Sequence, residues 1–491
     1  MSAGRRAARG LGLGPLVLFA AALACSSPSG GCSSDGGFWG DGGFWDFPPT
    51  PTPELIDAPD GGRLYLLLDG PAGPAIHVIQ VGTNATASLL PLATVTSASS
   101  LAFDPVSGGF RVADSSRFGV ALLDATGEEV GFLDTVARPV DVEYAPLLQR
   151  TFVATTEGLL IFDAENALID GLRPPDSIST AVSIRERETV YEDDDCGYPR
   201  TLVETYVALS TITEAGGTVY DAWWESLPGD DVENVFAESH GSTDLADSLC
   251  VPRPDDVLVS GFESPPFVGD SECDRIFLHG SSANLGAAAS GSKPTANRLA
   301  WSAERGVLLA AEADSLFALD PVTRSVETIP GFARATVVAG SIGGRNIWVG
   351  SAALDSASQP VLHRWAVGPP VDMPAGPAGT SVVDIDYVDR PPRFQNLGWG
   401  GIGVVTKRGR LGYYRVEAVD DDGDVLVIAV PDPVVGLRFD DDTHAFTWRI
   451  PCDEEATYLT VRITATAGRY RSPIDFTLFI DEDEPGDPCA E

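Results

Sequence analysis

Residues 101–124 read LAFDPVSGGFRVADSSRFGVALLD, and this stretch decides the fold. It contains three apolar runs, Leu101 to Phe103, Phe110 to Ala113 and Val120 to Leu123, which are separated by turn residues such as Asp, Pro, Gly and Ser. Short apolar runs bounded by such residues predict β-strands joined by tight turns. An aspartate, Asp124, follows the third run and closes the unit.

This unit recurs along the chain. Residues 142–163 read VEYAPLLQRTFVATTEGLLIFD and residues 299–320 read LAWSAERGVLLAAEADSLFALD, and each again ends in aspartate. Phe103 and its counterpart Tyr144 are about 41 residues apart, and partial copies begin near Leu64 and Ile347. A period of about 40–45 residues with four strands per unit indicates the blades of a β-propeller, which form a ring because one blade cannot bury both of its faces. Residues 61–390 therefore predict an all-β propeller, and we expect seven blades.

The blade pattern resembles the YncE/YVTN-like seven-bladed propellers of bacterial envelopes. The resemblance rests on a strand, a turn such as Asp104-Pro105, a second strand, and a third strand that ends in aspartate before the next turn. It implies a YVTN-repeat propeller that works in the cell envelope. The rhythm weakens at about 185–295, where we expect a loop-rich insert whose long loops project from one face and contact a ligand.

Near residue 390 the pattern changes to strands at regular spacing, which indicates a β-sandwich over residues 391–491 with an acidic tail. A tyrosine-rich strand runs into the segment 418–426, AVDDDGDVL. A strand around Trp448 and a closing strand at 476–480 follow it. This set resembles a bacterial cadherin-like or Ig-like module.

The aspartates Asp420, Asp422 and Asp424 alternate around Gly423. Clustered carboxylates at a tight turn supply the hard oxygen ligands that calcium prefers. The cadherin-like resemblance implies a calcium role for the first positions of this motif. The alternative is a hairpin turn held by bonds between Asp side chains and the backbone. We keep both interpretations, with calcium as the one cofactor that the sequence suggests.

The first 24 residues predict an export signal. A basic start that contains Arg5, Arg6 and Arg9 precedes an uncharged run over residues 11–24, which ends directly before Cys25. A run of this length is too short for a stable membrane-spanning helix. A cysteine directly after a small residue resembles a bacterial lipoprotein signal, which implies acylation of Cys25. Residues 25–60 are rich in Gly, Ser and Pro and predict a flexible tether, while ordinary secretion is the alternative.

The chain has 491 residues, of which 71 are acidic and 32 basic, and its formal net charge is −39. Such a surface repels nucleic acid, so we expect no nucleic-acid partner. Six cysteines remain beyond Cys25, and an even number outside the cytoplasm suggests disulfides. We prefer the pair Cys452 and Cys489, because both lie in the last domain.

The sequence carries no HExxH, GxSxG or P-loop motif. We therefore predict no catalytic residues and no enzyme. The leading hypothesis is an exported binding or adhesion protein, lipid-anchored to the outer membrane on its periplasmic side or at the cell surface. The propeller loops would hold an unidentified protein or glycan. The alternatives are a metal-dependent propeller hydrolase of the lactonase kind and a structural component of an outer-membrane assembly.

Overall fold

The computed structural model describes residues 54–55, 61–81, 87–192, 199–226, 240–245, 251–260, 266–270, 273, 275–278, 299–302, 305–312, 315–332, 335–340, 346–352, 356–365, 371–388, 391–394, 402–420, 424, 426–431, 436–440, 443–468, 470–481 and 489. Among these residues, no helix has the length and apolarity needed to cross a bilayer. The predicted signal peptide, Cys25 and most of the predicted tether lie outside the described residues.

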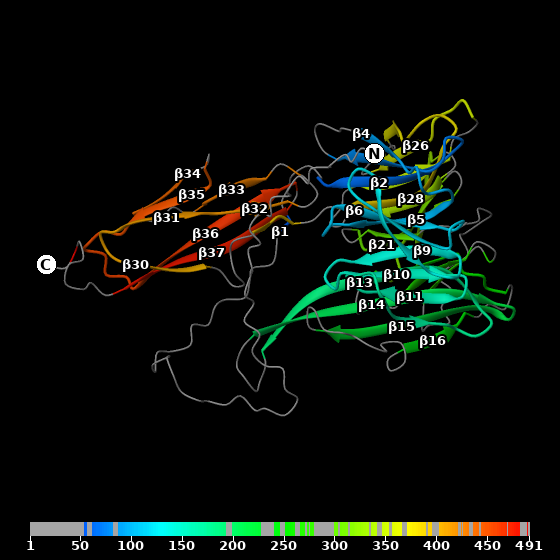
Figure 1. Cartoon of the computed structure of the whole chain (residues 1–491), viewed down its shortest axis with the longest axis horizontal. Helices are drawn as coiled ribbons and strands as arrows, with labels where there is room; N and C mark the ends of the chain where they lie inside the picture. Colours follow the sequence, from blue (N-terminus) through cyan, green and yellow to red (C-terminus); the bar gives the residue numbers. More distant parts are fainter. Residues whose placement is uncertain are drawn as a thin grey trace, which may run out of the picture. The chain divides into compact units, whose positions relative to one another are not determined.

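Seven antiparallel sheets follow one another over residues 63–388 and form the blades of a propeller (Figure 1). Blades one and two contain β5 (Ala98–Asp104), β6 (Gly109–Asp114), β7 (Gly119–Leu123) and β8 (Glu129–Asp134), then β9 (Pro139–Ala145), β10 (Arg150–Thr155), β11 (Gly158–Phe162) and β12 (Leu168–Leu172). Blades three and four contain β13 (Ile178–Glu192), β14 (Pro199–Thr213), β15 (Gly216–Ser226) and β16 (His240–Asp244), then β17 (Asp256–Leu258), β18 (Phe267–Asp270) and β19 (Arg275–Leu278). Blades five and six contain β20 (Leu299–Ser302), β21 (Val307–Glu312), β22 (Ser315–Leu319) and β23 (Val326–Pro330), then β24 (Ala335–Gly340), β25 (Ile347–Ser351), β26 (Val361–Trp365) and β27 (Val371–Pro374).

The seventh blade closes the ring, because it combines strands from both ends of the propeller. It contains β2 (Arg63–Asp69), β3 (Ala75–Gln80) and β4 (Ala87–Pro91) from before blade one, and β28 (Ser381–Val388) from after blade six. β28 pairs antiparallel with β2, from Arg63 opposite Val388 to Asp69 opposite Ser381. The ring therefore cannot open without breaking the hydrogen bonds of this sheet.

Every pair of neighbouring blades shares one buried apolar cluster. Seven such clusters follow one another around the ring, which confirms the all-β, seven-bladed prediction. Large members of these clusters, in order from the junction of blades seven and one to that of blades six and seven, are Phe103, Phe162, Phe152, Tyr206, Phe267, Phe332 and Trp348.

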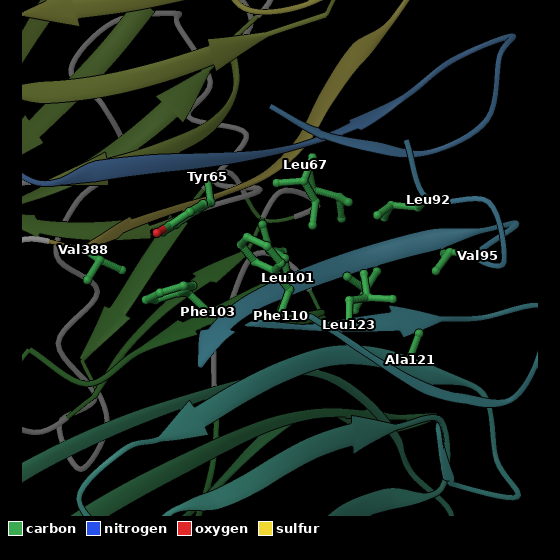
Figure 2. Packing of buried hydrophobic residues seen from close by; sticks show 12 residues of the cluster. Tyr65, Leu67, Leu92, Val95, Leu101, Phe103, Phe110, Ala121, Leu123 and Val388 are labelled. Atoms are coloured by element: carbon green, nitrogen blue, oxygen red, sulfur yellow. The ribbon is translucent and has the colours of Figure 1, made fainter. Parts of the chain in front are cut away.

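Strand β2 explains why the blade strands are so apolar. Its run Leu64–Leu68 is at most 1% exposed. The even-numbered leucines belong to the cluster that contains Trp348 of blade six, while Tyr65 and Leu67 belong to the cluster that contains Phe103 of blade one (Figure 2). The Tyr65 and Phe103 rings stack with their centroids 4.5 Å apart. Since successive side chains of a strand point to opposite faces, a strand that is buried on both faces needs a continuous apolar run.

The described part of the region 185–295, for which the sequence predicted a loop-rich insert, forms strands of blades three and four, and the long loops expected there lie largely outside the described residues. β13 and β14 have 15 residues each and β15 has 11, so this blade has the longest strands of the propeller. The end of β13 reads RERETVYE, which is polar and charged. Long strands of this kind stretch the repeat and hide its period in the sequence.

The C-terminal region forms three more sheets. A five-stranded sheet contains β1 (Glu54–Leu55), β37 (Tyr470–Ile480), β36 (Tyr458–Ala467), β33 (Val427–Ala429) and β30 (Ile402–Thr406), the last parallel to β37. A three-stranded sheet contains β31 (Leu411–Arg415), β35 (Ala445–Arg449) and β34 (Leu437–Asp440), and a two-stranded sheet contains β29 (Arg393–Phe394) and β32 (Ala418–Val419). Residues 54–55 fall in the predicted tether, yet they already pair with β37.

The two larger C-terminal sheets share one apolar core, as the sequence predicted for a β-sandwich. Phe446 and Trp448 of β35 pack with Phe476 of β37, and the rings of Phe446 and Phe476 stack at 5.2 Å. The predicted bond between Cys452 and Cys489 is confirmed, with Cα atoms 5.3 Å apart and a sequence separation of 37. The cadherin-like or Ig-like assignment stays a prediction.

Candidate functional site at the inner strands of the propeller

The first strands of successive blades lie against one another and carry the carboxylates that face the next blade. Asp384 on β28 accepts hydrogen bonds from the Ser100 hydroxyl and the Leu101 backbone N–H of β5, both at 2.9 Å. Asp141 on β9 accepts from the same hydroxyl at 2.6 Å and from the Val182 N–H of β13 at 3.0 Å. A serine between two carboxylates therefore links blades seven, one and two, and Asp141 extends the link to blade three.

Similar hydrogen bonds between neighbouring blades recur farther around the ring. Asp256 on β17 accepts from the Leu299 N–H of β20 at 2.6 Å, and Ser183 on β13 accepts from the Val259 N–H at 3.0 Å. Thr336 on β24 donates to the Val382 carbonyl of β28 at 2.7 Å. We call this set of contacts the inner polar ring; its side chains are those of Ser100, Asp141, Ser183, Asp256, Thr336 and Asp384.

The inner polar ring is buried, which decides what its carboxylates can do. Asp141, Asp256 and Asp384 are 5%, 6% and 8% exposed, and Ser100 is 1% exposed. A buried charge is costly unless hydrogen-bond donors surround it, and backbone N–H groups of the next blade supply such donors. Serine has a single hydroxyl proton, so Ser100 can donate to only one of its two carboxylate neighbours at a time. These groups hold blades together and present little surface to a ligand.

The sequence analysis missed the inner polar ring. Its signal is an aspartate directly before a β-branched residue in the first strand of a blade, as at Asp141, Asp256 and Asp384. The period is also visible, because Ser100 to Asp141 and Asp141 to Val182 are both steps of 41 residues. From the sequence alone, an aspartate within a strand is expected to face solvent. Only the structure shows that the neighbouring blade covers it.

The aspartates that end the third strands, which the sequence analysis used to define the repeat, have a turn function. Asp124 accepts bonds from the Thr126 N–H and hydroxyl and from the Glu128 N–H. Asp320 accepts from the two N–H groups that follow it in its own turn. Bonds from these turns hold the pKa of both carboxyls below the ordinary aspartate value. The repeated aspartate therefore stabilises the turn that follows the third strand of the blade.

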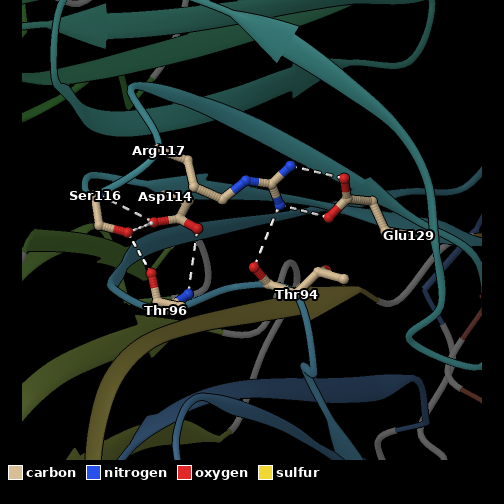
Figure 3. A network of polar contacts seen from close by, with 6 residues as sticks. All are labelled: Thr94, Thr96, Asp114, Ser116, Arg117 and Glu129. Atoms are coloured by element: carbon tan, nitrogen blue, oxygen red, sulfur yellow. Dashed lines mark hydrogen bonds and ion pairs between the residues drawn. The ribbon is translucent and has the colours of Figure 1, made fainter.

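A second polar network lies in blade one (Figure 3). Arg117 donates to both oxygens of Glu129, at 2.6 and 2.8 Å, and to the Thr94 carbonyl at 3.3 Å. The buried Asp114 accepts from the Thr96 N–H at 3.2 Å and from the Ser116 N–H and hydroxyl. The bond with Arg117 lowers the pKa of Glu129. The network fastens the connection between β4 and β5 to the turn between β6 and β7.

The predicted calcium residues are only partly described, since Asp422 lies outside the described residues. Both oxygens of Asp424 lie 3.0 Å from the Gly62 N–H, and Gln80 Nε2 donates at 3.1 Å. Asp420 Oδ1 accepts from the Asp424 N–H at 2.8 Å, so Asp420 closes the turn. Burial and the nearby Asp420 charge raise the pKa of Asp424. The described residues give donors to Asp424, not a set of oxygen ligands.

Glycines surround the Asp424 carboxylate, which shows how closely it is packed. A Cβ atom built on Gly61 would lie 1.6 Å from Asp424 Oδ2, and one built on Gly468 would lie 2.5 Å from the same atom. In the described part of the chain, no group of three or more His, Cys, Asp or Glu side chains could hold a metal ion. Calcium binding at Asp420, Asp422 and Asp424 therefore stays a prediction without support from the geometry.

Comparisons with known proteins find similar folds among solved structures only. No family model matches the chain, and no curated protein matches it. Among solved structures, it is similar to the β-propeller domain of Cps50 (Swd1) from Myceliophteria thermophila, with 13% identity and a TM-score of 0.42 over 64% of this chain and 99% of that one. A candidate 6-phosphogluconolactonase from Bacteroides uniformis gives 13% and 0.43 over 67% and 100%. A nidogen/laminin complex gives 11% and 0.37 over 66% and 97%. Likenesses this distant carry no argument about function.

Proposed function

We propose that this chain is a lipid-anchored cell-envelope protein whose propeller serves as a rigid binding or adhesion scaffold. The observation that carries the proposal is the inner polar ring. Its buried carboxylates accept backbone N–H groups from the next blade, so they act in holding the ring together. A ring fixed in this way keeps its loops at constant positions, which lowers the ordering cost of binding a ligand.

The anchoring part of the proposal rests on the sequence. Cys25 follows an export signal directly, and a Gly-, Ser- and Pro-rich stretch separates it from the first strand. Acylation of one cysteine with several chains would hold the protein at the outer membrane, and the tether would give the propeller room to reach a protein or glycan. The periplasmic side and the cell surface are both compatible with this arrangement.

Detergent partition of the full precursor, expressed in a Gram-negative host, tests the anchor. We expect the mature wild-type protein in the detergent phase and Cys25→Ser in the aqueous phase. Cys32→Ser is the matched control, because it removes a nearby thiol from the same stretch without touching the acylation position. Equal partition of wild type and Cys25→Ser into the aqueous phase would contradict lipid anchoring.

Binding is tested separately with the purified full chain on arrays of glycans and extracellular proteins, alongside a hydrolase assay on lactones with and without calcium. A saturable ligand without turnover supports the scaffold proposal. Lactone hydrolysis that increases with calcium would favour the hydrolase instead.

A thermal melt with millimolar calcium and then with chelator, on wild type and Asp422→Ala, decides whether the 420–424 turn binds the ion.

A further inference from the structure

One carboxylate of the C-terminal sandwich is bonded to the start of the propeller. The Gly62 N–H, directly before β2, donates to both oxygens of Asp424 at 3.0 Å. Gln80 Nε2, at the end of β3, donates to Asp424 Oδ1 at 3.1 Å. Gln80 belongs to blade seven, and Gly62 leads into its strand β2. We call this set of bonds the Asp424 contact.

Hydrogen bonds within blade seven hold the donors of the Asp424 contact in position. Gln80 Nε2 also donates to the Gly62 carbonyl at 3.0 Å, and Gln80 Oε1 accepts from Arg63 Nε at 3.0 Å. The Tyr387 hydroxyl of β28 donates to the Gly61 carbonyl at 2.9 Å. The side-chain amide of Gln80 therefore uses both of its donor protons and one acceptor. The blade thus offers the carboxylate two fixed N–H groups, which lower the cost of removing its charge from water.

Glycines on both sides allow the backbone to come this close to the carboxylate. A Cβ atom on Gly61, in the propeller connection, would lie 1.6 Å from Asp424 Oδ2. Gly468, between β36 and β37, has a φ of +50°, and a Cβ atom there would lie 2.5 Å from the same oxygen and 3.2 Å from the Gly61 Cα. A side chain at either position would displace the carboxylate, so both positions need glycine.

The Asp424 contact does not fit the calcium site that the cadherin-like resemblance implies. Calcium takes about six to eight oxygen ligands, whereas the N–H groups of Gly62 and Gln80 direct hydrogens at the Asp424 oxygens that would have to bind it. Asp420 Oδ1 accepts from the Asp424 N–H at 2.8 Å, and Asp420 Oδ2 is buried without a partner. One carboxylate oxygen does not make a calcium site, so the described part of the turn suits hydrogen-bond donors.

Few other contacts fix the sandwich relative to the propeller. The chain passes between them twice, from β1 to β2 and from β28 to β29. Two chain connections still allow one part to rotate about the line that joins them, and relative motion of domains is expected unless a large apolar interface prevents it. The apolar cluster of the sandwich contains no residue of blade seven among the residues that the structure describes. A third point of attachment is therefore needed to stop this rotation.

We propose that the Asp424 contact is this third attachment, and that it fixes the C-terminal sandwich on blade seven in place of a calcium ion. Asp420 shapes the turn, and Asp424 reaches across to the propeller. The aspartate-rich turn is then a device for orienting two domains. This inference does not depend on lipid anchoring or on a ligand of the propeller.

Hydrogen exchange followed by mass spectrometry on the purified full chain tests the contact at the amide of Gly62. Gly62 is buried, and the carboxylate is the acceptor of its N–H. Asp424→Ala removes this acceptor, while Gly61→Ala displaces it without changing any charge. We expect the Gly62 amide to exchange about tenfold faster or more in both variants, as for the loss of a bond to a charged acceptor. Small-angle X-ray scattering should show a larger radius of gyration in both.

Two matched variants separate the contact from general effects. Asp453→Ala removes an exposed aspartate of the C-terminal region, and Gly73→Ala adds a methyl group at a propeller turn where a Cβ atom meets nothing within 4 Å. Both should exchange and scatter like wild type, and every protein should behave alike with millimolar calcium and with chelator. Unchanged exchange in Asp424→Ala and Gly61→Ala, equal changes in the controls, or an unchanged radius of gyration would overturn the proposal. Loss of Gly62 protection from wild type in chelator would also overturn it.

Discussion

The substitution Asp384→Ala should weaken the junction between blade seven, in which both ends of the ring meet, and blade one. Asp384 lies on β28 and accepts hydrogen bonds from the Ser100 hydroxyl and the Leu101 N–H of blade one. Ser100 is 1% exposed and Leu101 is 5% exposed. Alanine therefore removes the acceptor of the buried Leu101 N–H, while the Ser100 hydroxyl keeps Asp141 as an acceptor.

The magnitude follows from these two bonds. A hydrogen bond to a charged acceptor contributes about 1.5–3 kcal/mol net, which is the size of the lost Leu101 bond, while the Ser100 proton is shared with Asp141 and adds less. Removal of the buried charge offsets part of this loss, because a carboxylate at 8% exposure has a desolvation cost of its own. We expect Asp384→Ala to lower the free energy of unfolding by about 2–3 kcal/mol. Asp384→Asn keeps an acceptor oxygen and should lose about half as much.

Urea denaturation of the purified chain, followed by tryptophan fluorescence, measures the effect through the transition midpoint at constant slope. Asp69→Ala is the control, since Asp69 is exposed at the end of β2 and its removal changes the net charge by the same amount. An exposed substitution of this kind should stay within about 0.5 kcal/mol of wild type. If Asp384→Ala costs no more than Asp69→Ala, the inner polar ring does not hold the blades together.

Three further predictions concern the C-terminal sheets. Burial raises the pKa of Asp424 above its ordinary value of 3.8, so the folded chain takes up this proton before the unfolded chain does as the pH falls. Wild type should therefore gain stability relative to Asp424→Asn as urea denaturation is moved from neutral pH toward pH ~4. Replacing both Cys452 and Cys489 by serine opens a loop of 37 residues, which should cost about 3–4 kcal/mol on the chain-entropy model. A Cβ atom on Gly412 would lie 2.0 Å from Trp448 Cε2, so Gly412→Ala should destabilise the sandwich by about 1–3 kcal/mol.

A specific result would contradict each of these three predictions. A stability difference between wild type and Asp424→Asn that is constant with pH would mean that the pKa of Asp424 is not raised in the folded chain. A double serine variant that is as stable as wild type would mean that the Cys452–Cys489 disulfide does not stabilise the folded chain. An unchanged melting temperature in Gly412→Ala would mean that Trp448 can move away, and a loss of tryptophan quenching would then report the movement.

Local sequence patterns were enough to predict the propeller. The runs at Leu64–Leu68, Leu101–Phe103 and Val120–Leu123 are apolar because their blades are buried on both faces, and the aspartates after the third strands are read from the chain because turn bonds are local. The pair Cys452 and Cys489 was also predictable, since both cysteines lie in one short C-terminal stretch. Where the strands are longer, as in β13 and β14, the repeat is stretched and its period is hard to see in the sequence.

Contacts between distant segments were beyond the sequence. Asp384 and Ser100 are 284 residues apart, and Asp424 and Gly62 are 362 apart, so no local rule connects either pair. The same holds for strand β1, whose pairing with β37 appears only when the two ends of the chain are brought together. The sequence determined that this is an acidic, all-β repeat protein, because period and composition are properties of single segments. The tertiary structure alone decided that buried aspartates tie the blades together, because burial and register depend on which strands become neighbours.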